Sequence, residues 1–401
     1  MKHFLHEHCE TAHKFDQTHS NNVDEIISRS RIDSDFIWPS ADPRNLPQPT
    51  RMIHGNDDEL YHELLKTKFD SEKFIKTHAD KGIVENIINI LNHNSFQFNS
   101  RGRFRGNSIW WRRLEKAVAA GQPVQILILA FCIIANPTKR IQRTAITLSE
   151  DISLLHMSNI AKQISNIYPP GAVFEVISDS TFYALPFNLT SVETHFYLTE
   201  LYKRVDALGI QDSVRIHDIS DYLAEDICRF QSSYERWKQI FDDDPLADGI
   251  SEENLTQWYL NMRCSINTKR CGFSYREIVE QLGSEKYSVD KLAWQARTGL
   301  TDYRALKAAA AEVEWEDRVF PLAIRATIHS KKNGTLGLRI YPQYKRRSHL
   351  LPYHGIGIVE RDAKYGVRRM TVQHEMTVVG QASFRRVIDE RQRTIFYEKM
   401  E

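Results

Sequence analysis

Residues 123–134 read PVQILILAFCII, the continuous apolar run that decides the fold. A strand that is apolar on both faces is typical of the centre of a parallel sheet. Two more strands are expected further along, AVFEVIS at 172–178 and VRIHDI at 214–219. The stretches between them, 150–167 and 192–208, carry apolar residues at helical spacing. This alternation predicts an α/β fold with a doubly wound, mainly parallel sheet.

The regions on either side of these strands differ in character. Residues 56–122 have helical periodicity and end at Gly121-Gln122-Pro123, a stop signal for a helix. An α/β domain is predicted over 123–361, with a helical insertion at about 221–312. Short strands follow at 322–330, 336–342, 355–361 and 368–375, with Asn333-Gly334 as a hairpin signal between the first two. We expect an antiparallel C-terminal extension joined to the parallel sheet, with residues 362–401 at its end.

Residues 1–55 form a leader rich in histidine and proline, which we expect to be flexible. Its histidines and Cys9 could also chelate a metal ion, but their spacing matches no closed metal site. A solvated or loosely docked leader is therefore the favoured interpretation. The segment has no apolar core typical of a secretory signal.

Composition excludes several classes of function. The 401 residues (46.7 kDa) contain 53 Lys and Arg against 52 Asp and Glu, a formal charge of +1. A chain so balanced has no global electrostatic attraction for nucleic acid or an anionic membrane. Its longest apolar run is shorter than the ~20 residues that span a bilayer. Five cysteines without CxxC spacing indicate a reduced, cytoplasmic setting.

Familiar cofactor motifs are missing. The sequence contains no GxGxxG, no GxxxxGK[ST], no HExxH and no GxSxG. Local sequence therefore gives no support to dinucleotide binding, a P-loop, a zinc peptidase or a serine hydrolase. We predict that the protein uses no cofactor and no metal ion.

Polar side chains follow the predicted strands at their carboxyl ends, where ligands bind in open α/β sheets. The segment after 123–134 brings Asn136, Lys139 and Arg140 to this edge. Asp179 and Ser180 close the strand 172–178. These residues are candidates for a site, although Asp179 could equally cap the next turn.

Three further candidates lie in the last part of the chain. Arg325 and His329 are four apart in IRATIH, so a strand would point both side chains to one face. His354, in LPYHG, follows a proline just before a predicted strand. Taken alone, an arginine and a histidine on one strand face are more often exposed or ion-paired, and a lone histidine before a strand is more often structural.

The order of these segments resembles the isocyanide (isonitrile) synthase family, also called the pyoverdine/dityrosine biosynthesis family. ILAFCIIANP resembles the family's strand-and-turn segment, and SEDISLL with YPPGAVFEVISDSTFY resembles its helix, YPPG break and following strand. FPLAIRATIHS resembles its IRxxIH piece, and LPYHGIGIV its PxHG piece. Ile134 stands where the family has a lysine, Ser180 where it has a glycine, and Tyr353 where it has the aromatic residue of the PxHG piece.

The resemblance implies a Rossmann-like fold. It also implies conversion of an amino acid's α-amino group, often that of tyrosine or tryptophan, to an isonitrile. The added carbon would come from ribulose 5-phosphate, and a separate Fe(II)/2-oxoglutarate oxygenase is the implied pathway partner. The protein would then be a transferase-like enzyme of specialised-metabolite biosynthesis. The alternatives are a diverged enzyme with different chemistry on an amine or amino acid, and a non-catalytic member that binds an amino acid or a partner enzyme.

The resemblance implies a catalytic or substrate-binding role for each candidate residue. Cationic donors suit a sugar phosphate, and imidazoles suit proton transfer near neutrality. The expected catalytic residues are His329, His354, Asp179 and Lys139. The expected substrate-binding residues are Arg325, Arg140, Glu150, Ser180 and Tyr353.

Overall fold

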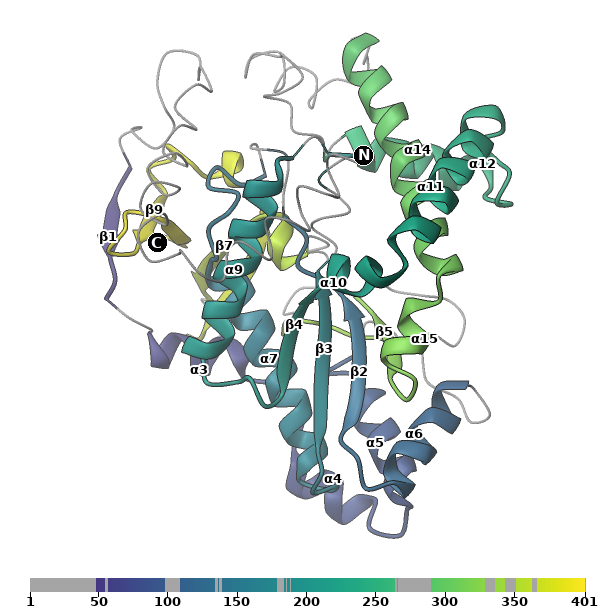
Figure 1. Cartoon of the computed structure of the whole chain (residues 1–401). Helices are drawn as coiled ribbons and strands as arrows, with labels where there is room; N and C mark the ends of the chain where they lie inside the picture. The colour runs from purple at the N-terminus through teal and green to yellow at the C-terminus, as the bar shows by residue number, and fades with distance from the viewer. Residues whose placement is uncertain are drawn as a thin grey trace, which may run out of the picture.

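The computed structural model of the chain describes residues 48–54, 57–97, 109–133, 136, 139–178, 184, 186–187, 189–263, 265, 290–328, 336–342, 351–362 and 366–400. Two sheets organise this part of the chain, with a long helix between them (Figure 1).

The first sheet contains five parallel strands in the order β4-β3-β2-β5-β6. They are β4 (Val214–Asp218), β3 (Ala172–Ser178), β2 (Val124–Leu129), β5 (Ile324–Thr327) and β6 (Leu336–Gly337). The predicted α/β class and parallel sheet are confirmed. Strand order reverses beside β2, since β3 and β4 lie on one side of it and β5 and β6 on the other. Ligands of such sheets bind at this reversal, beyond the carboxyl ends of the strands.

Helices cover both faces of this sheet. Apolar residues on one face, such as Ile126 and Phe174, pack with α7 (Leu148–Ser165) and α9 (Ser191–Ala207). Those on the other face, such as Leu127 and Ile177, pack with α10 (Ile219–Leu223), α11 (Ile227–Asp243), α14 (Asp290–Glu312) and α15 (Trp315–Val319). The connection α12 (Glu252–Arg263) packs on α14. Before β2 come α3 (Asp58–Leu65), α4 (Ser71–Thr77), α5 (Ile83–Leu91) and α6 (Ile109–Ala119).

β2 is shorter than the apolar run predicted. It ends at Leu129, and Phe131 adopts a left-handed conformation with φ 61°. The Phe131 carbonyl accepts a hydrogen bond of 3.1 Å from Ser178 Oγ at the end of β3. Ala130, Phe131 and Ile133 are thus buried although they lie beyond the end of the strand.

The second sheet has the order β1-β9-β10-β7-β8. Its strands are β1 (Thr50–Met52), β9 (Phe384–Ile388), β10 (Thr394–Lys399), β7 (Ile356–Arg361) and β8 (Arg368–Gln373). The antiparallel pairs expected in the C-terminal extension are present as β7–β8 and β9–β10. The parallel pairs β1–β9 and β7–β10 make the sheet mixed, and it is separate from the first sheet instead of joined to it.

The hairpin predicted at Asn333-Gly334 is wrong. β5 and β6 are parallel, whereas a hairpin would make them antiparallel. Both strands extend the buried parallel sheet, β5 by pairing with β2 and β6 by pairing with β5, and this pairing outweighs a local turn preference. Asn333 and Gly334 themselves lie outside the described residues.

Helix α7 lies between the two sheets and is buried around most of its circumference. It contacts β3 and β4 on one side and β7 and β10 on the other. The approach to β7 is close, because a Cβ on Gly357 would lie 3.1 Å from Ser149 Oγ. Because the helix is buried on both sides, polar residues such as Ser153 and His156 are buried with its apolar ones.

The YPPG break has a structural role at the end of α7. Gly171 has φ +72°, and a Cβ there would lie 2.6 Å from Ser165 Oγ. The Tyr168 hydroxyl donates a 2.8 Å hydrogen bond to the carbonyl of Gln122, just before β2. The turn therefore sets where β3 begins beside β2.

Residues 48–52 dock on the second sheet, although they fall within the segment expected to be a flexible leader. The Gln48 side-chain amide donates to the carbonyls of Val378 and Phe384, both at 3.0 Å, and β1 pairs with β9. Backbone pairing gives this short segment stability that its composition does not reveal. The proposed division into leader, helical region, α/β domain and extension stays a prediction.

We expect a chain that starts at residue 48 to melt at the temperature of the full chain, and one that starts at His54 to melt lower. The second loses the Gln48 bonds and β1, whereas residues 1–47 offer little apolar surface to bury. Circular dichroism melts measure both. An equal loss in the two truncations would contradict the prediction.

His156 should make the protein sensitive to acid. Both its ring nitrogens lack hydrogen-bond partners, and burial, with the nearby Arg339 charge, lowers its pKa to about 3. The unfolded chain therefore binds more protons below about pH 6.5, and stability falls as the pH drops from there toward 3. Between pH 7.5 and 5 the wild type should lose about 2 kcal/mol that a His156→Phe variant keeps.

Urea unfolding of both proteins at the two pH values measures this difference. Phenylalanine is close in shape and removes the unpaired nitrogens, so the variant should fold at pH 7.5. Equal acid sensitivity of the two proteins would contradict the prediction.

Candidate active site

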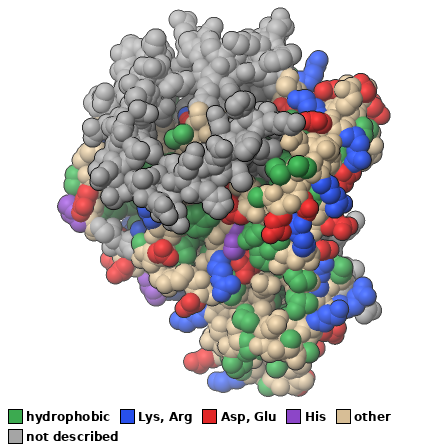
Figure 2. Space-filling model, in the orientation of Figure 1, with side chains coloured by type: hydrophobic (Ala, Val, Ile, Leu, Met, Phe, Trp, Pro, Cys, Tyr) green, Lys and Arg blue, Asp and Glu red, His purple; other side chains and the backbone are tan. Residues whose placement is uncertain are grey.

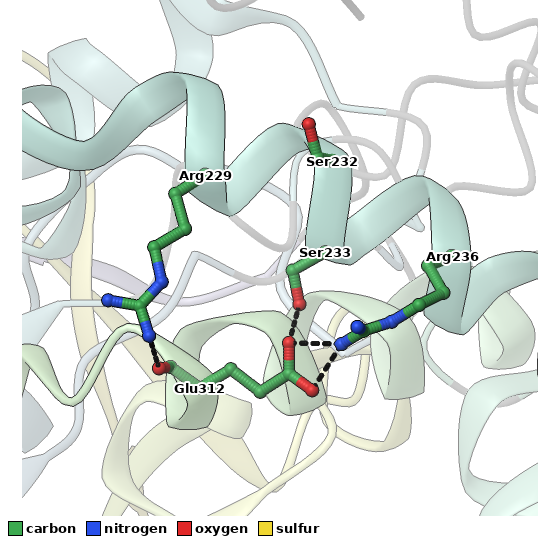
Figure 3. A pocket seen from close by; sticks show the side chains of 5 residues that line it. All are labelled: Arg229, Ser232, Ser233, Arg236 and Glu312. Atoms are coloured by element: carbon green, nitrogen blue, oxygen red, sulfur yellow. Dashed lines mark hydrogen bonds and ion pairs between the residues drawn. The ribbon is translucent and has the colours of Figure 1, made fainter.

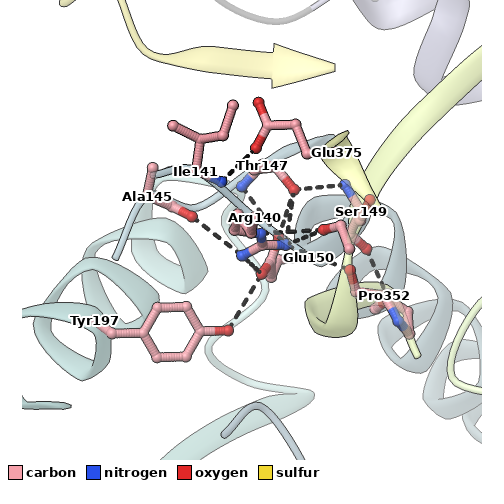
Figure 4. A network of polar contacts seen from close by, with 11 residues as sticks. Arg140, Ile141, Ala145, Thr147, Ser149, Glu150, Tyr197, Pro352 and Glu375 are labelled. Atoms are coloured by element: carbon pink, nitrogen blue, oxygen red, sulfur yellow. Dashed lines mark hydrogen bonds and ion pairs between the residues drawn. The ribbon is translucent and has the colours of Figure 1, made fainter. Parts of the chain in front are cut away.

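Three segments that are far apart in sequence meet at the carboxyl end of β2. They are the chain after β2 up to residue 147, the N-terminus of α7, and the turn η5 (Pro352–His354). Figure 4 shows how their polar groups converge. The segments contain Lys139, Arg140, Glu150, Tyr353 and His354, so the structure brings together five of the nine predicted site residues.

A fully buried ion pair lies at the centre of this arrangement. Arg140 Nη1 is 2.6 Å from Glu150 Oε1, and Nη2 is 3.1 Å from Oε2, a two-pronged contact. The side chains are 1% and 0% exposed. Burial alone would lower the pKa of Arg140, but the Glu150 carboxylate outweighs it and raises that pKa. Arg140 is therefore held in its charged form, in a strong two-pronged contact.

Glu150 also takes part in the N-terminal cap of α7, whose N-cap residue is Thr147. Its carboxylate accepts from the backbone N–H and the hydroxyl of Thr147, at 3.1 and 2.6 Å, which forms a capping box. The Tyr197 hydroxyl, from α9, donates to Glu150 Oε1 at 3.2 Å. The same carboxylate thus starts α7 and neutralises Arg140.

Glu375 connects the site to the second sheet. Its buried carboxylate accepts from the Ile141 N–H at 2.6 Å and from the Tyr397 hydroxyl at 3.1 Å. Burial raises the pKa of Glu375 despite these donors and the nearby Arg140 charge. The adjacent His374 has a lowered pKa because it is buried and close to the Lys139 charge.

Lys139 is nearly buried next to this network. Its Nζ is 3.3 Å from Ser265 Oγ, just beyond the end of α12, and its carbonyl accepts from the Glu375 N–H at 2.9 Å. The helical insertion therefore reaches the loop after β2. A lysine placed beside a hydroxyl at this edge suits an anionic substrate or amine chemistry.

The turn η5 carries an aromatic and a titratable side chain. The Tyr353 ring packs against Phe131 at 5.3 Å between centroids, and the His354 ring meets Tyr353 edge-on at 4.9 Å. Tyr353 is buried, whereas His354 is partly exposed. His354 is thus the more accessible of the two for proton transfer.

Arg325 is placed differently from the prediction. It pairs in register with Leu127, inside the sheet, and forms a 2.6 Å ion pair with Glu316 of α15. Its described contacts are with this helix and not with the Arg140 network. β5 spans Ile324–Thr327 and is shorter than the strand predicted over 322–330. His329, Asp179 and Ser180 lie outside the described residues, as does Ile134.

A surface hollow between α11 and α14 is separate from this site. It is lined by Arg229, Ser232, Ser233, Arg236 and Glu312 (Figure 3). Glu312 accepts from Ser233 and Arg236, and its backbone carbonyl accepts from Arg229 at 2.9 Å. These polar groups satisfy one another and stabilise the helix pair, so the hollow offers no chemistry of its own.

Sequence reasoning missed Tyr197 and Glu375. Tyr197 lies within a helix with apolar spacing, and Glu375 follows a strand at the edge of a predicted extension. Their partners are 47 and 234 residues away in sequence, so no local pattern could have identified them.

Within the described residues, no group of three or more His, Cys, Asp or Glu side chains is placed to hold a metal ion. In that same part of the chain, no helix is long and apolar enough to cross a membrane. On the face shown in Figure 2, acidic and basic side chains alternate over the described surface.

Residues 114–379 match the family of pyoverdine/dityrosine biosynthesis proteins. The chain is 22% identical over 257 residues to L-tyrosine isonitrile synthase of Xenorhabdus nematophila, covering 61% of this chain and 70% of that protein. It is 23% identical over 261 residues to isocyanide synthase A of Aspergillus fumigatus, covering 63% of this chain but 39% of that protein.

The fold is similar to that of a solved structure, PvcA of Pseudomonas aeruginosa. The TM-score is 0.55 at 18% sequence identity, and the match covers 85% of this chain and 99% of the other. At that identity the likeness concerns the fold. The matched family region includes the loop after β2, α7, η5 and Glu375.

Proposed function

Because the chain belongs to the pyoverdine/dityrosine biosynthesis protein family, we propose that it is an isocyanide synthase-like enzyme of specialised metabolism. It would convert the amino group of an amino acid to an isonitrile, with ribulose 5-phosphate as the carbon donor. The supporting observation is that Arg140, in the chain after β2, contacts both the SED and the PYHG pieces, which are about 200 residues apart, at the carboxyl end of β2.

In this proposal, each described residue of the site has its own role in binding or catalysis. Lys139 would hold the sugar phosphate or take part in amine chemistry, and His354 would move protons between imine intermediates. The Tyr353 ring would line the substrate-binding site. Arg325, His329, Asp179 and Ser180 stay in the proposal as further substrate-binding and catalytic residues.

One feature of the sequence favours a second candidate. Ile134 replaces the family lysine, so the chain could carry a diverged reaction on an amine or amino acid, or bind one without catalysis. Lys139, five residues further on, is the amine that would have to replace it in standard chemistry.

Incubation of the purified protein with a panel of amino acids and uniformly ¹³C-labelled ribulose 5-phosphate tests the proposal. Mass spectrometry should show an isonitrile that carries one labelled carbon. Binding of an amino acid in calorimetry with no labelled product would favour the non-catalytic candidate instead.

The oxygenase partner and the compartment follow from the same proposal. An isonitrile product would pass to a Fe(II)/2-oxoglutarate oxygenase in the pathway. Cys132 and Cys228, the two cysteines that the structure describes, form no disulfide bond, which agrees with a reduced, cytoplasmic setting.

We expect Lys139→Ala to abolish turnover that depends on the sugar phosphate, because this amine is at the ligand-binding edge of the sheet. Lys162→Ala is the matched control, since Lys162 is exposed on α7. Product formation is followed by mass spectrometry. Equal activities of the two variants would remove Lys139 from the mechanism.

We expect His354→Gln to lower turnover by about 10²–10⁴-fold, the usual contribution of one acid–base group. The melting temperature should stay near that of the wild type because the ring is partly exposed. Kinetics and melting curves of the same preparation separate the two effects. A stable variant with full activity would exclude His354 as the acid–base group.

A further inference from the structure

Arg140 was expected to bind substrate, but its contacts point to another task. Each nitrogen of its guanidinium already donates to a protein oxygen, and the side chain is 1% exposed. We infer that Arg140 is a positioning residue, which holds the turn carrying Tyr353 and His354 in its working orientation. This inference rests on the proposed function and assigns a role within the same site.

The guanidinium holds the backbone on both sides of His354. Arg140 Nη2 donates to the carbonyl of Gly355 at 2.8 Å and to that of Pro352 at 3.4 Å. Its Nε donates to the Gly355 carbonyl as well, at 3.1 Å. One rigid planar group therefore fixes the two peptide units between which Tyr353 and His354 project.

The other edge of the guanidinium is anchored to the start of α7. Nη1 donates to Glu150 and, at 3.3 Å, to the carbonyl of Ala145. Glu150 is itself held by Thr147 and Tyr197. The position of the turn is thus set by α7 and α9 through a chain of short contacts.

The far side of the turn is equally confined. A Cβ on Gly355 would lie 2.3 Å from the carbonyl oxygen of Gln373 in β8, so this residue must be glycine. The Tyr353 ring rests on Phe131 after β2. Held between β8, Phe131 and Arg140, the His354 ring has a defined direction, which is what acid–base catalysis requires.

A lysine could not replace Arg140 in this role. Its single ammonium lacks the planar fork that contacts Glu150 and two carbonyls at once. The charge would remain, but the geometry would not. Arg140→Lys is therefore the informative substitution, because it separates positioning from charge.

Hydrogen–deuterium exchange with mass spectrometry tests the inference without requiring activity. In Arg140→Lys, backbone amides of residues 351–356 should exchange faster, while those of 172–178 in β3 should not change. Arg304→Lys is the matched control, since Arg304 is 4% exposed and donates to the Pro245 carbonyl and to Asp248 in the helical insertion. It should leave exchange at 351–356 unchanged.

Kinetics with the amino acid and ribulose 5-phosphate give the second readout. A misplaced catalytic group should lower kcat by about 10²-fold with KM nearly unchanged. Arg304→Lys should keep kcat. A raised KM with an unchanged kcat would make Arg140 a substrate ligand and overturn the inference, as would unchanged exchange at 351–356.

The experiment stays decisive if the Arg140 variant does not fold or if the wild type is inactive. If Arg140→Lys does not fold, Tyr197→Phe removes one contact to Glu150 and should cause a smaller rise in exchange at 351–356; no rise there would overturn the inference. If the wild type makes no isonitrile, the proposed function fails, but the exchange data still decide whether Arg140 holds the turn.

Discussion

The Arg140–Glu150 ion pair is the interaction on which the rest of the structure depends. Burial of two charges is costly unless each is paired and hydrogen-bonded, and loss of one partner typically costs about 3–5 kcal/mol. Here each charge has several further contacts, from Thr147, Tyr197 and the carbonyls of the 352–355 turn. The pair joins the loop after β2, the start of α7 and the turn that leads into β7 of the second sheet.

The position of α7 explains why such a pair is needed. The helix lies between the two sheets, so its N-terminus is far from water and its free N–H groups must find partners inside the protein. Glu150 provides one through the capping box with Thr147. Because the helix starts at the reversal of strand order, the same carboxylate also stabilises the edge where ligands of α/β proteins bind.

The second sheet provides contacts to the site in addition to covering α7. Glu375 reaches from the end of β8 to the Ile141 N–H, and β7 begins directly after the turn that carries His354. Glycines at 355 and 357 let β8 and α7 approach the backbone closely. The family pattern of a glycine after the histidine thus has a steric reason, independent of the reaction.

Sequence alone determined the elements, because each depends on local periodicity and stop signals. The strand at 172–178, the helices near 150–167 and 192–208, and the break at YPPG follow from residues next to one another. With the family resemblance, it also predicted that Lys139, Arg140, Glu150, Tyr353 and His354 contribute to one site. Tertiary structure decided the rest. Contacts between distant segments decide the direction of β6 and the end of β2 at Leu129. They also decide the ion pair of Arg325 with Glu316 and the hydrogen bonds that Tyr197 and Glu375 make at the site. The free energy of these contacts comes from burial and hydrogen bonding between remote segments, and no local pattern of residues records it.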